Sequence, residues 1–518
     1  MNKENIEKIF VAILIIAMLG IIFFFQTQKI GFHEDEIYTS ISSVNPLNGL
    51  MWAYGEPWEN KVPIWLSRQY VTDFITLSKD NYLNLHSVYQ NQEYDNHPPF
   101  FYTLVHFSSM LFGGEFTKYN VFIVNAISFI LSCLVIRKIF QVLGKDKLQY
   151  AGLILYGLSM GTISMVLFQR MYMLLTFFIL LYLYYTLKIY KNNFVFGKKD
   201  MIFLGLTTVL GFLTQYFFAI YAVFLFALMV IQMVRKKADK KNILLYIGCH
   251  IIYAVVGILL FTPCINHLLY SDRGISNLGN GEFFTHCWQY VKHLAYAFSI
   301  DGSNTVLTAI ILVIFVGLIV YLFKKSNEKF TVSLLVIPSV LYFFIAVKMT
   351  SFQELRYVMP MIPFIVLLII LILDSLKLRE IAIAVISCLL VLVGFVVSKP
   401  LFLYSGYQQC LDMAEENRDK SFVYVYDNFF CHMQSVPEMM IYEKSLIINV
   451  NEDELKYIID NEELNNEDAY ILCIKNYMDN DSIISQIKEN TDFKNIEKIY
   501  EAPSSHYEVE NNLYLVSK

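Results

Sequence analysis

Long apolar runs recur along this chain and are separated by shorter polar stretches. Eleven of these runs approach the ~20 residues that an α-helix needs to cross a bilayer. They lie at about 9–27, 119–136, 150–168, 172–190, 201–214, 217–234, 243–263, 304–323, 330–347, 357–373 and 380–397. A twelfth run, Pro98 to Phe112, is shorter than the rest, begins with two prolines and contains His106. The pattern predicts an α-helical polytopic membrane protein with about eleven transmembrane helices.

The distribution of Lys and Arg decides whether the twelfth run crosses the membrane. Cytoplasmic loops of membrane proteins carry an excess of these residues. If the twelfth run does not cross, the basic loops all fall on one side, near 137–147, 188–199, 235–241, 324–329 and 377–379. We therefore expect a multi-pass plasma-membrane protein with a cytoplasmic N-terminus and an extracytoplasmic C-terminal part. Residues 98–112 would then lie as an amphipathic helix in the outer interface.

Two long stretches interrupt the spans on the outer side, and a polar tail follows the last span. The first exterior loop covers about 28–118 and the second about 264–303. Loops of such length are usually functional. Residues 399–518 alternate strand-like runs with acidic, helical runs, which is typical of a small soluble α/β domain. The predicted organisation is a transmembrane domain over 1–398 and an extracytoplasmic α/β domain over 399–518.

Composition agrees with a bilayer environment and narrows the function classes. Hydrophobic residues make up 56% of the 518 residues and charged residues 16%, whereas soluble domains average roughly 45–50% and 25%. The formal net charge of −5 leaves no basic footprint for nucleic acid. The eight cysteines show neither a CxxC motif nor a Cys/His zinc spacing. Composition thus argues against a nucleic-acid-binding protein and a zinc-finger protein.

Four ionisable residues, His33-Glu34-Asp35-Glu36, follow the first predicted span directly. A carboxylate held at a low-dielectric boundary has a perturbed proton affinity and can act as a base. Asp35 and Glu36 are the candidate catalytic pair, because neighbours on a helix point about 100° apart and can take separate roles. The alternative is a solvated helix N-terminus, where acidic residues meet the helix dipole favourably.

The first exterior loop ends in Asp95-Asn96-His97-Pro98-Pro99. The double proline fixes the backbone just before the interfacial helix. His97 and His33 could join carboxylates around a divalent metal, or they could simply form hydrogen bonds. A divalent metal cofactor therefore stays open at this stage.

Two arginines lie at the outer ends of predicted spans, and each is followed closely by a tyrosine. They are Arg170, ahead of Tyr172, and Arg356, ahead of Tyr357. A lone arginine at such a place often extends toward the lipid headgroups. Two on the side of the acidic residues better suit a phosphate clamp, since a guanidinium binds phosphate oxygens in a bidentate fork. Three further residues are expected at the same cavity: Lys348 as a third cation, and Gln215 and Tyr216 in a tight exterior turn.

These motifs, taken in order, resemble glycosyltransferase family 39. The resemblance rests on five motifs over roughly residues 8–400: Asp35-Glu36, His97-Pro98-Pro99, Arg170-x-Tyr172, Thr214-Gln215-Tyr216-Phe217 and Arg356-Tyr357-x-x-Pro360. The family includes protein O-mannosyltransferases, is similar to the aminoarabinose transferase of lipid A, and has the GT-C fold. Each motif is short, and the match depends on their order and their shared exterior placement.

The resemblance implies an inverting transfer of a sugar from a polyprenyl-phosphate donor to an acceptor hydroxyl on the outer face. Asp35 matches the family's general base, and Glu36 would support or orient it. Arg170, Arg356 and Lys348 would bind the phosphate leaving group. The acceptor implied is a glycolipid, a protein or a wall polymer in the cell envelope.

Tyr172 marks a departure from the family pattern. The lipid A transferases carry a carboxylate near the position of Tyr172, so an aminoarabinose-type substrate is not expected here.

A transporter or flippase of a lipid-linked glycan also needs many spans and outer charges. Transporters, however, tend to place ionisable groups near the bilayer midplane. Here the polar groups collect at the outer surface, which favours chemistry on a lipid-linked substrate.

Overall fold

The computed structural model describes residues 3–46, 64–270, 283–350, 353–426, 433–449, 455–503 and 508–518. The part of the second exterior loop at 271–282 lies outside these ranges. Within them, eight helices are long and apolar enough to cross a bilayer. They are α1 (Lys3–Gln28), α7 (Asn120–Val142), α10 (Tyr172–Lys191), α12 (Phe217–Arg235), α13 (Lys240–Leu260), α16 (Thr305–Lys325), α17 (Lys329–Met349) and α19 (Glu380–Val397).

The other three predicted spans are helical as well, but they differ from a straight crossing. The run at 150–168 forms α8 (Gln149–Gly157) and α9 (Met160–Leu167), which bend by 59° at a break and count together as a ninth possible span. Ser159 causes the restart, because its side chain accepts a hydrogen bond from the backbone N–H of Thr162 and caps α9. The remaining two runs are the 17-residue α11 (Lys198–Thr214) and the short apolar segment Met359–Ser375, which contains α18 (Ile362–Ser375).

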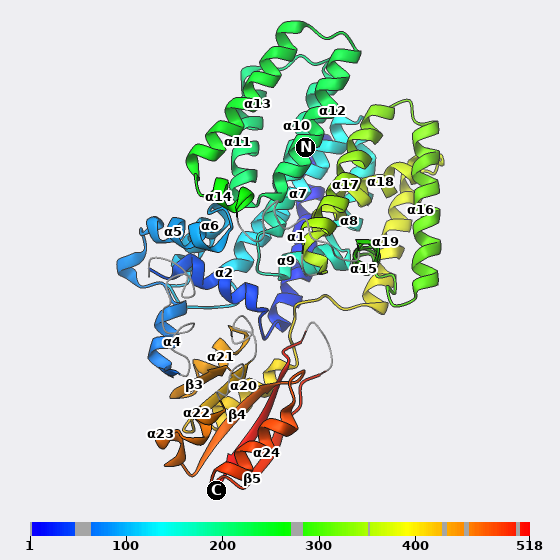
Figure 1. Ribbon diagram of the computed structural model, residues 1–518. Coiled ribbons are helices and arrows are strands. Elements are labelled where there is room, and N and C mark those ends of the chain that lie inside the picture. The colour runs from blue at the N-terminus through cyan, green and yellow to red at the C-terminus, as the bar shows by residue number, and fades with distance from the viewer. Residues whose placement is uncertain are drawn as a thin grey trace.

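The first exterior loop folds into short elements between the membrane helices and the C-terminal domain (Figure 1). The twelfth apolar run forms α6, whose 12 residues rise only about 18 Å, too little to cross a bilayer. The elements of this loop are α2 (Glu34–Val44), β1 (Ile64–Ser67), α4 (Arg68–Ile75), α5 (Leu85–Asp95) and α6 (Phe100–Leu111).

The C-terminal part is an α/β domain with one six-stranded sheet in the order β1-β3-β2-β4-β6-β5. Parallel pairing joins β2 to β3 and to β4, and antiparallel pairing joins β6 to β4 and to β5. The edge strand β1 comes from the first exterior loop and pairs antiparallel with β3, which the sequence pattern did not predict. The other strands of the sheet are β2 (Phe422–Tyr426), β3 (Lys444–Asn449), β4 (Ala469–Lys475), β5 (Asn495–Tyr500) and β6 (Asn511–Ser517). The helices of the domain are α20 (Tyr407–Glu416), α21 (Val436–Met439), α22 (Lys456–Ile459), α23 (Glu462–Asn465) and α24 (Asn480–Asn490).

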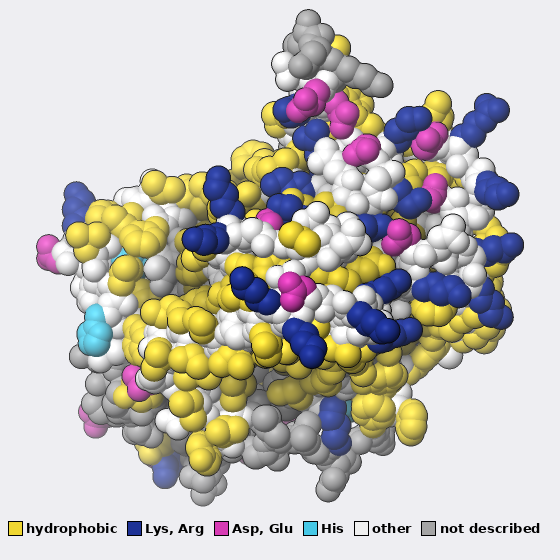
Figure 2. Space-filling view, turned by 90° about the horizontal axis from the view of Figure 1, so that it is seen from above, with side chains coloured by type: hydrophobic (Ala, Val, Ile, Leu, Met, Phe, Trp, Pro, Cys, Tyr) yellow, Lys and Arg dark blue, Asp and Glu magenta, His cyan; other side chains and the backbone are white. Residues whose placement is uncertain are grey.

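Lys and Arg side chains gather on the face of the membrane domain that points away from the C-terminal domain (Figure 2). They belong to the loops that the sequence pattern assigned to the cytoplasmic side. Examples are Lys145, which pairs with Asp374, and Lys188, which pairs with Asp200. The protein is thus a multi-pass membrane protein with its basic loops at one end, and the assignment of that end to the cytoplasm stays a prediction.

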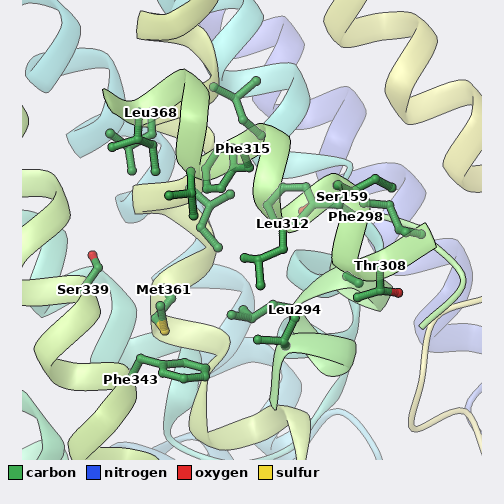
Figure 3. Close-up of a pocket in the computed structure, with 18 of the residues that line it drawn as sticks. Ser159, Leu294, Phe298, Thr308, Leu312, Phe315, Ser339, Phe343, Met361 and Leu368 are labelled. Carbon is green, nitrogen blue, oxygen red and sulfur yellow. The ribbon is translucent and has the colours of Figure 1, made fainter. Parts of the chain in front are cut away.

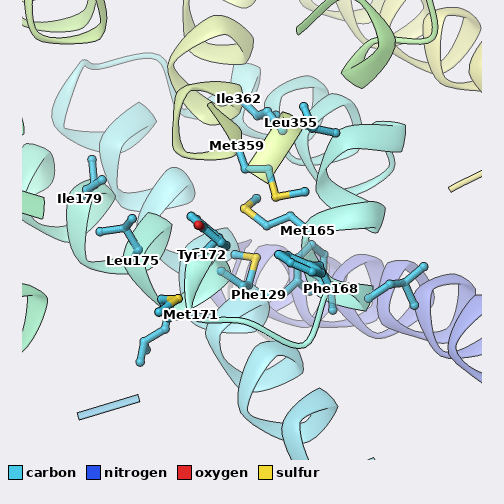
Figure 4. Close-up of a cluster of buried hydrophobic side chains, with 14 of the residues drawn as sticks. Phe129, Met165, Phe168, Met171, Tyr172, Leu175, Ile179, Leu355, Met359 and Ile362 are labelled. Carbon is cyan, nitrogen blue, oxygen red and sulfur yellow. The ribbon is translucent and has the colours of Figure 1, made fainter. Parts of the chain in front are cut away.

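A buried apolar cluster supports the segments that carry the candidate site residues (Figure 4). Phe129 of α7, Met165 of α9 and Met359 lie in it, together with Phe168 and Tyr172 on either side of Arg170. The amide of Asn125 donates to the backbone oxygens of Val166 and Phe168, at 3.2 and 2.8 Å. The α9–α10 connection is therefore held both by packing and by a buried side-chain clamp.

Candidate active site

Asp35 lies in the first turn of α2, and the start of this helix is fixed by a capping box. Nδ1 of His33 accepts the backbone N–H of Asp35 at 3.1 Å, while the Glu36 carboxylate accepts the backbone N–H of His33 at 2.8 Å. Such reciprocal caps satisfy two otherwise unpaired donors. The Asp35 carboxylate is thus presented from a rigid helix start, with 27% of its side chain exposed.

Arg356 and Arg170 both converge on Asp35, although the three residues are far apart in the sequence. Arg356 Nη1 forms an ion pair with Asp35 Oδ2, and its Nη2 lies 3.2 Å from Glu354 Oε1. Arg170 Nη1 donates to the backbone oxygen of Asp35 at 3.2 Å. The same nitrogen also donates to the hydroxyls of Thr39 and Tyr102, at 2.9 and 3.1 Å. The structure therefore brings the proposed base and both proposed phosphate ligands to one place.

The charges around Asp35 keep it ionised. Burial alone would raise the pKa of this carboxyl, but the neighbouring Arg356 and then Arg170 outweigh burial and hold the pKa well below its ordinary value. Both guanidinium groups are more than nine-tenths buried, and the Nε of each has no hydrogen-bond partner among the described residues. Those two buried N–H groups are suited to donate hydrogen bonds to an anionic oxygen of a ligand.

His97 joins the same cluster through Arg170. Its Nδ1 lies 2.8 Å from the backbone oxygen of Asp95 and 3.0 Å from that residue's carboxylate, and both oxygens only accept. Nδ1 therefore carries the proton. Nε2 faces Arg170 Nη2 at 3.3 Å, so it accepts from the guanidinium. His97 thus orients Arg170.

Glu36 is fully buried and does not face the same space as Asp35. Its carboxylate accepts from Lys29 Nζ at 2.9 and 3.1 Å and from the backbone N–H of Gln169 at 2.7 Å. Lys29 is also fully buried and donates to the backbone oxygen of Phe402 at 2.6 Å. Glu36 and Gln169 are the chain neighbours of Asp35 and Arg170, so this pair sets the separation of the base from the arginine. Sequence reasoning missed Lys29, because a lysine directly after a membrane helix is ordinary until its partner is known.

Tyr172 and Tyr357 lie beside the arginines. Their rings meet edge to face at 6.3 Å between centroids, and the Arg356 guanidinium lies over the ring of Tyr357 at 5.1 Å. Phe217, which follows the predicted turn, also contacts Tyr357 edge to face at 6.1 Å. These aromatic rings pack beside the Arg356 guanidinium, and a place for Tyr172 and Tyr357 at the substrate cavity stays a prediction.

Gln215 and Tyr216 act from a greater distance. Gln215 Oε1 accepts the backbone N–H of Tyr216 at 2.6 Å and so shapes the turn between α11 and α12. The Tyr216 hydroxyl lies 2.8 Å from Nδ1 of His267, whose Nε2 lies 2.8 Å from the backbone oxygen of Glu93. This chain of contacts ties the turn to the end of α5, two residues before Asp95. The described contacts thus tie Tyr216 to the segment before His97, and a place for Gln215 and Tyr216 at the substrate cavity stays a prediction.

The far end of α2 is held by two side chains that sequence reasoning did not single out. Asn91 donates to the backbone oxygens of Ser42 and Asn45, each at 3.1 Å. The buried His106 lies with Nδ1 at 2.7 Å from the backbone oxygen of Ser43 and with Nε2 at 2.9 Å from that of Tyr82. The helix that carries Asp35 is therefore fixed at both ends.

Two expectations remain: Lys348 as a third cation at the phosphate, and a divalent metal near His33 and His97. Lys348 lies half-buried in the last turn of α17, and its role at the phosphate stays a prediction. His33 Nδ1 caps α2, and His97 pairs with Asp95 and Arg170. Across the described ranges, no three His, Cys, Asp or Glu side chains are grouped so as to hold a metal ion.

An apolar cavity of about 660 Å³ lies among the membrane helices (Figure 3). Met361, which follows Arg356 in the chain, lines it, and so do residues of α15 (Phe283–Ala297). Tyr290 of α15 donates to or accepts from Thr350 at 2.6 Å, which ties this helix to the segment that leads to Arg356. Labelled lining residues in Figure 3 include Ser159, Leu294, Phe298, Leu312, Phe315 and Leu368.

Comparison with known proteins identifies the fold. No protein-family model matches the sequence, and no curated protein matches it. Among solved structures, ArnT from Cupriavidus metallidurans bound to undecaprenyl phosphate matches with a TM-score of 0.55 and 11% identity over 98% of each chain. ArnT from the same organism in the apo state matches with a TM-score of 0.53 and 10% identity over 97% of each chain. The chain therefore has the polytopic GT-C fold of these two structures.

Proposed function

We propose that this protein is a membrane glycosyltransferase that moves a sugar from a polyprenyl-phosphate donor to an acceptor hydroxyl on the outer face. The observation that carries the proposal is the convergence of Asp35, Arg356 and Arg170 at the start of α2. The fold adds support, because the matched ArnT is bound to undecaprenyl phosphate. The acceptor is a glycolipid, a protein or a wall polymer, and Tyr172 argues against an aminoarabinose-type donor.

The two arginines would bind the phosphate leaving group. Sugar transfer from a lipid phosphate leaves negative charge on the phosphate oxygens, and fixed cations stabilise that charge without reorganising. Arg356 and Arg170 each hold a buried Nε–H without a partner among the described residues. Lys348 would complete the clamp from α17.

Asp35 would act as the general base in an inverting displacement. It is ionised because the arginines lie beside it. When phosphate oxygens bind the same guanidinium groups, part of the positive charge that lowers the pKa of Asp35 is neutralised. The carboxylate then becomes a stronger base toward the acceptor hydroxyl, whose oxygen attacks the sugar carbon as the phosphate leaves on the opposite side. Glu36 would support this base by holding α2 in place.

The apolar cavity would take part of the polyprenyl chain. Its walls are almost wholly apolar side chains of α8, α15, α16, α17, α18 and α19 (Figure 3). Met361 places one end of the cavity close in sequence to Arg356. A lipid with its phosphate at the arginines could thus leave its hydrocarbon in the membrane domain.

The test is a transfer assay with purified protein and a polyprenyl-phosphate sugar. Asp35→Asn keeps the size of the side chain and removes the base, so transfer should fall by at least 10². The matched control is Asp80→Asn, the same change at an exposed acid of the first exterior loop, which should leave transfer intact. Unchanged transfer by Asp35→Asn would refute the base assignment. Loss of glycolipid translocation in place of transfer would favour a transporter.

A further inference from the structure

The C-terminal domain reaches Glu34, the residue before Asp35, through a buried amide. Gln434 precedes α21, which lies next to the α2 region in Figure 1. Its Nε2 donates to Glu34 Oε2 at 3.0 Å, and its Oε1 accepts from Lys475 Nζ at 2.7 Å. Gln434 is 7% exposed and Lys475 is 1% exposed. A buried hydrogen-bonded chain therefore links the sheet of the C-terminal domain to the residue before Asp35.

Lys475 determines which way this amide points. An ammonium group has donors only, so the amide atom that faces it must be the carbonyl oxygen. The amide NH₂ is then left to face Glu34, whose carboxylate only accepts. The orientation follows from chemistry alone, and it makes Gln434 a donor to the acidic loop.

The amide is also fixed at its backbone. The Tyr407 hydroxyl donates to the backbone oxygen of Gln434 at 3.1 Å and lies 2.9 Å from Glu438 Oε2. The next residue, Ser435, accepts from the side-chain amide of Asn511 at 2.8 Å. Lys475 and Asn511 are paired residues of the antiparallel strands β4 and β6. The donor to Glu34 is thus mounted on the sheet itself.

Glu34 needs such a partner because it competes with Asp35. The two carboxylates are chain neighbours in the first turn of α2, and Glu34 Oε2 lies 3.6 Å from Nδ1 of His33. A carboxylate without a fixed partner can turn toward a cation within its reach, and Arg356 and Arg170 already serve the neighbouring Asp35. Holding Glu34 with a neutral donor leaves those arginines to Asp35.

We propose that Gln434 is a positioning residue of the active site, through which the C-terminal domain holds Glu34 away from the Asp35–arginine cluster. This inference rests on the proposed glycosyl transfer. It gives the C-terminal domain a defined part in the reaction, because Gln434 of this domain donates to Glu34. Lys475 acts through Gln434 and is likewise a positioning residue.

The test exchanges the two partners. Gln434→Glu keeps an acceptor for Lys475 but sets a carboxylate against Glu34, so we expect kcat to fall about tenfold. An acid limb, which the starting protein lacks between pH 5 and 7, should appear in the kcat/KM profile, because Glu34 then competes for the arginines and the pKa of Asp35 rises. Adding Glu34→Gln to Gln434→Glu again pairs one amide with one carboxylate, now with the amide at position 34 and the carboxylate at position 434. The double variant should return kcat to within about threefold of the starting protein and restore the pH profile. Gln409→Glu, the same change at an exposed site of this domain, is the control.

Two outcomes would overturn the proposal: a Gln434→Glu variant with unchanged kcat and pH profile, or a double variant no better than the single one. The melting temperature separates this test from that of the function. If the starting protein transfers no sugar, the proposed function fails, while recovery of Tm in the swapped double variant still reports the Glu34–Gln434 contact. A defect in folding alone would lower Tm and leave the pH profile unchanged.

Discussion

Lys29 and Glu36 form an ion pair at 2.9 Å, and neither side chain has any exposed surface. The pair joins the end of α1 to the first turn of α2 and, through Gln169 and Phe402, to the α9–α10 connection and the segment that follows α19. Charged groups this deeply buried persist only when each is paired and hydrogen-bonded. The pair therefore fixes the place where Asp35 and Arg170 meet.

Removing one partner of this pair should be severe. Lys29→Met would leave the Glu36 carboxylate buried beside no cation, so we expect a loss of about 3–5 kcal/mol in stability. Thermal unfolding in detergent measures the loss, and donor turnover should fall with it. Lys29→Met combined with Glu36→Gln should recover most of the stability, because the uncompensated charge is gone. A single variant as stable as the starting protein would show that the pair does not hold the site.

Arg356→Lys tests the phosphate clamp. Lysine keeps the charge but loses the planar fork and the Nε–H, so kcat/KM for the donor should fall by about 10²–10³. Arg418→Lys, at a side chain that is 58% exposed, is the matched control and should leave the rate unchanged. Equal kinetics for the two variants would remove Arg356 from the donor site.

The pH dependence of the rate should report the charges around Asp35. Its pKa is held below the ordinary value by Arg356 and Arg170 against the opposing effect of burial, so the base stays ionised at mildly acidic pH. The kcat/KM profile should therefore have no acid limb from Asp35 between pH 5 and 7. Ordinary carboxyl and histidine groups have pKa values of about 4–6.5. Arg356→Gln should bring such a limb to higher pH. A limb near pH 6 in the unmodified protein would contradict this assignment.

Stability should fall as pH rises because of a second buried acid. Burial raises the pKa of Glu438 in the C-terminal domain to about 7, against lowering by hydrogen bonds and by Lys475. The folded protein then binds this proton more tightly than the unfolded chain, so the contribution is complete below the ordinary pKa and is lost as pH rises through about 7. The loss is on the order of 3 kcal/mol. Tm measured from pH 5 to 8 should decline, and Glu438→Gln should flatten that decline.

The sequence pattern predicted the helical membrane domain well, because apolar runs of span length report directly on a bilayer. Each of the eleven runs is helical, and the run at Pro98–Phe112 forms the short α6. The bend between α8 and α9 was not predicted, since Ser159 lies in a run whose hydropathy resembles that of an unbroken span. Strand β1 was missed for a different reason: its partner β3 lies far along the chain, and local alternation carries no record of pairing at that distance.

The candidate site was predictable where charge stood out against its surroundings. Asp35, Arg170 and Arg356 each interrupt apolar sequence at the outer side, and the structure brings them together. Lys29 and Gln434 were not predictable, because a lysine after a span and a glutamine in a soluble domain are ordinary residues until their partners are known. The roles of Glu36, Gln215 and Tyr216 as supports likewise depend on contacts with distant segments.

Single-turnover transfer with the donor already bound tests the central claim most directly, because it separates binding from chemistry. Purified Asp35→Asn protein is loaded with a polyprenyl-phosphate sugar, and donor binding is followed by its effect on Tm before acceptor is added. The account predicts donor binding at least as strong as in the unmodified protein and a transfer rate lower by at least 10². Transfer at the unmodified rate from the bound donor would contradict the account.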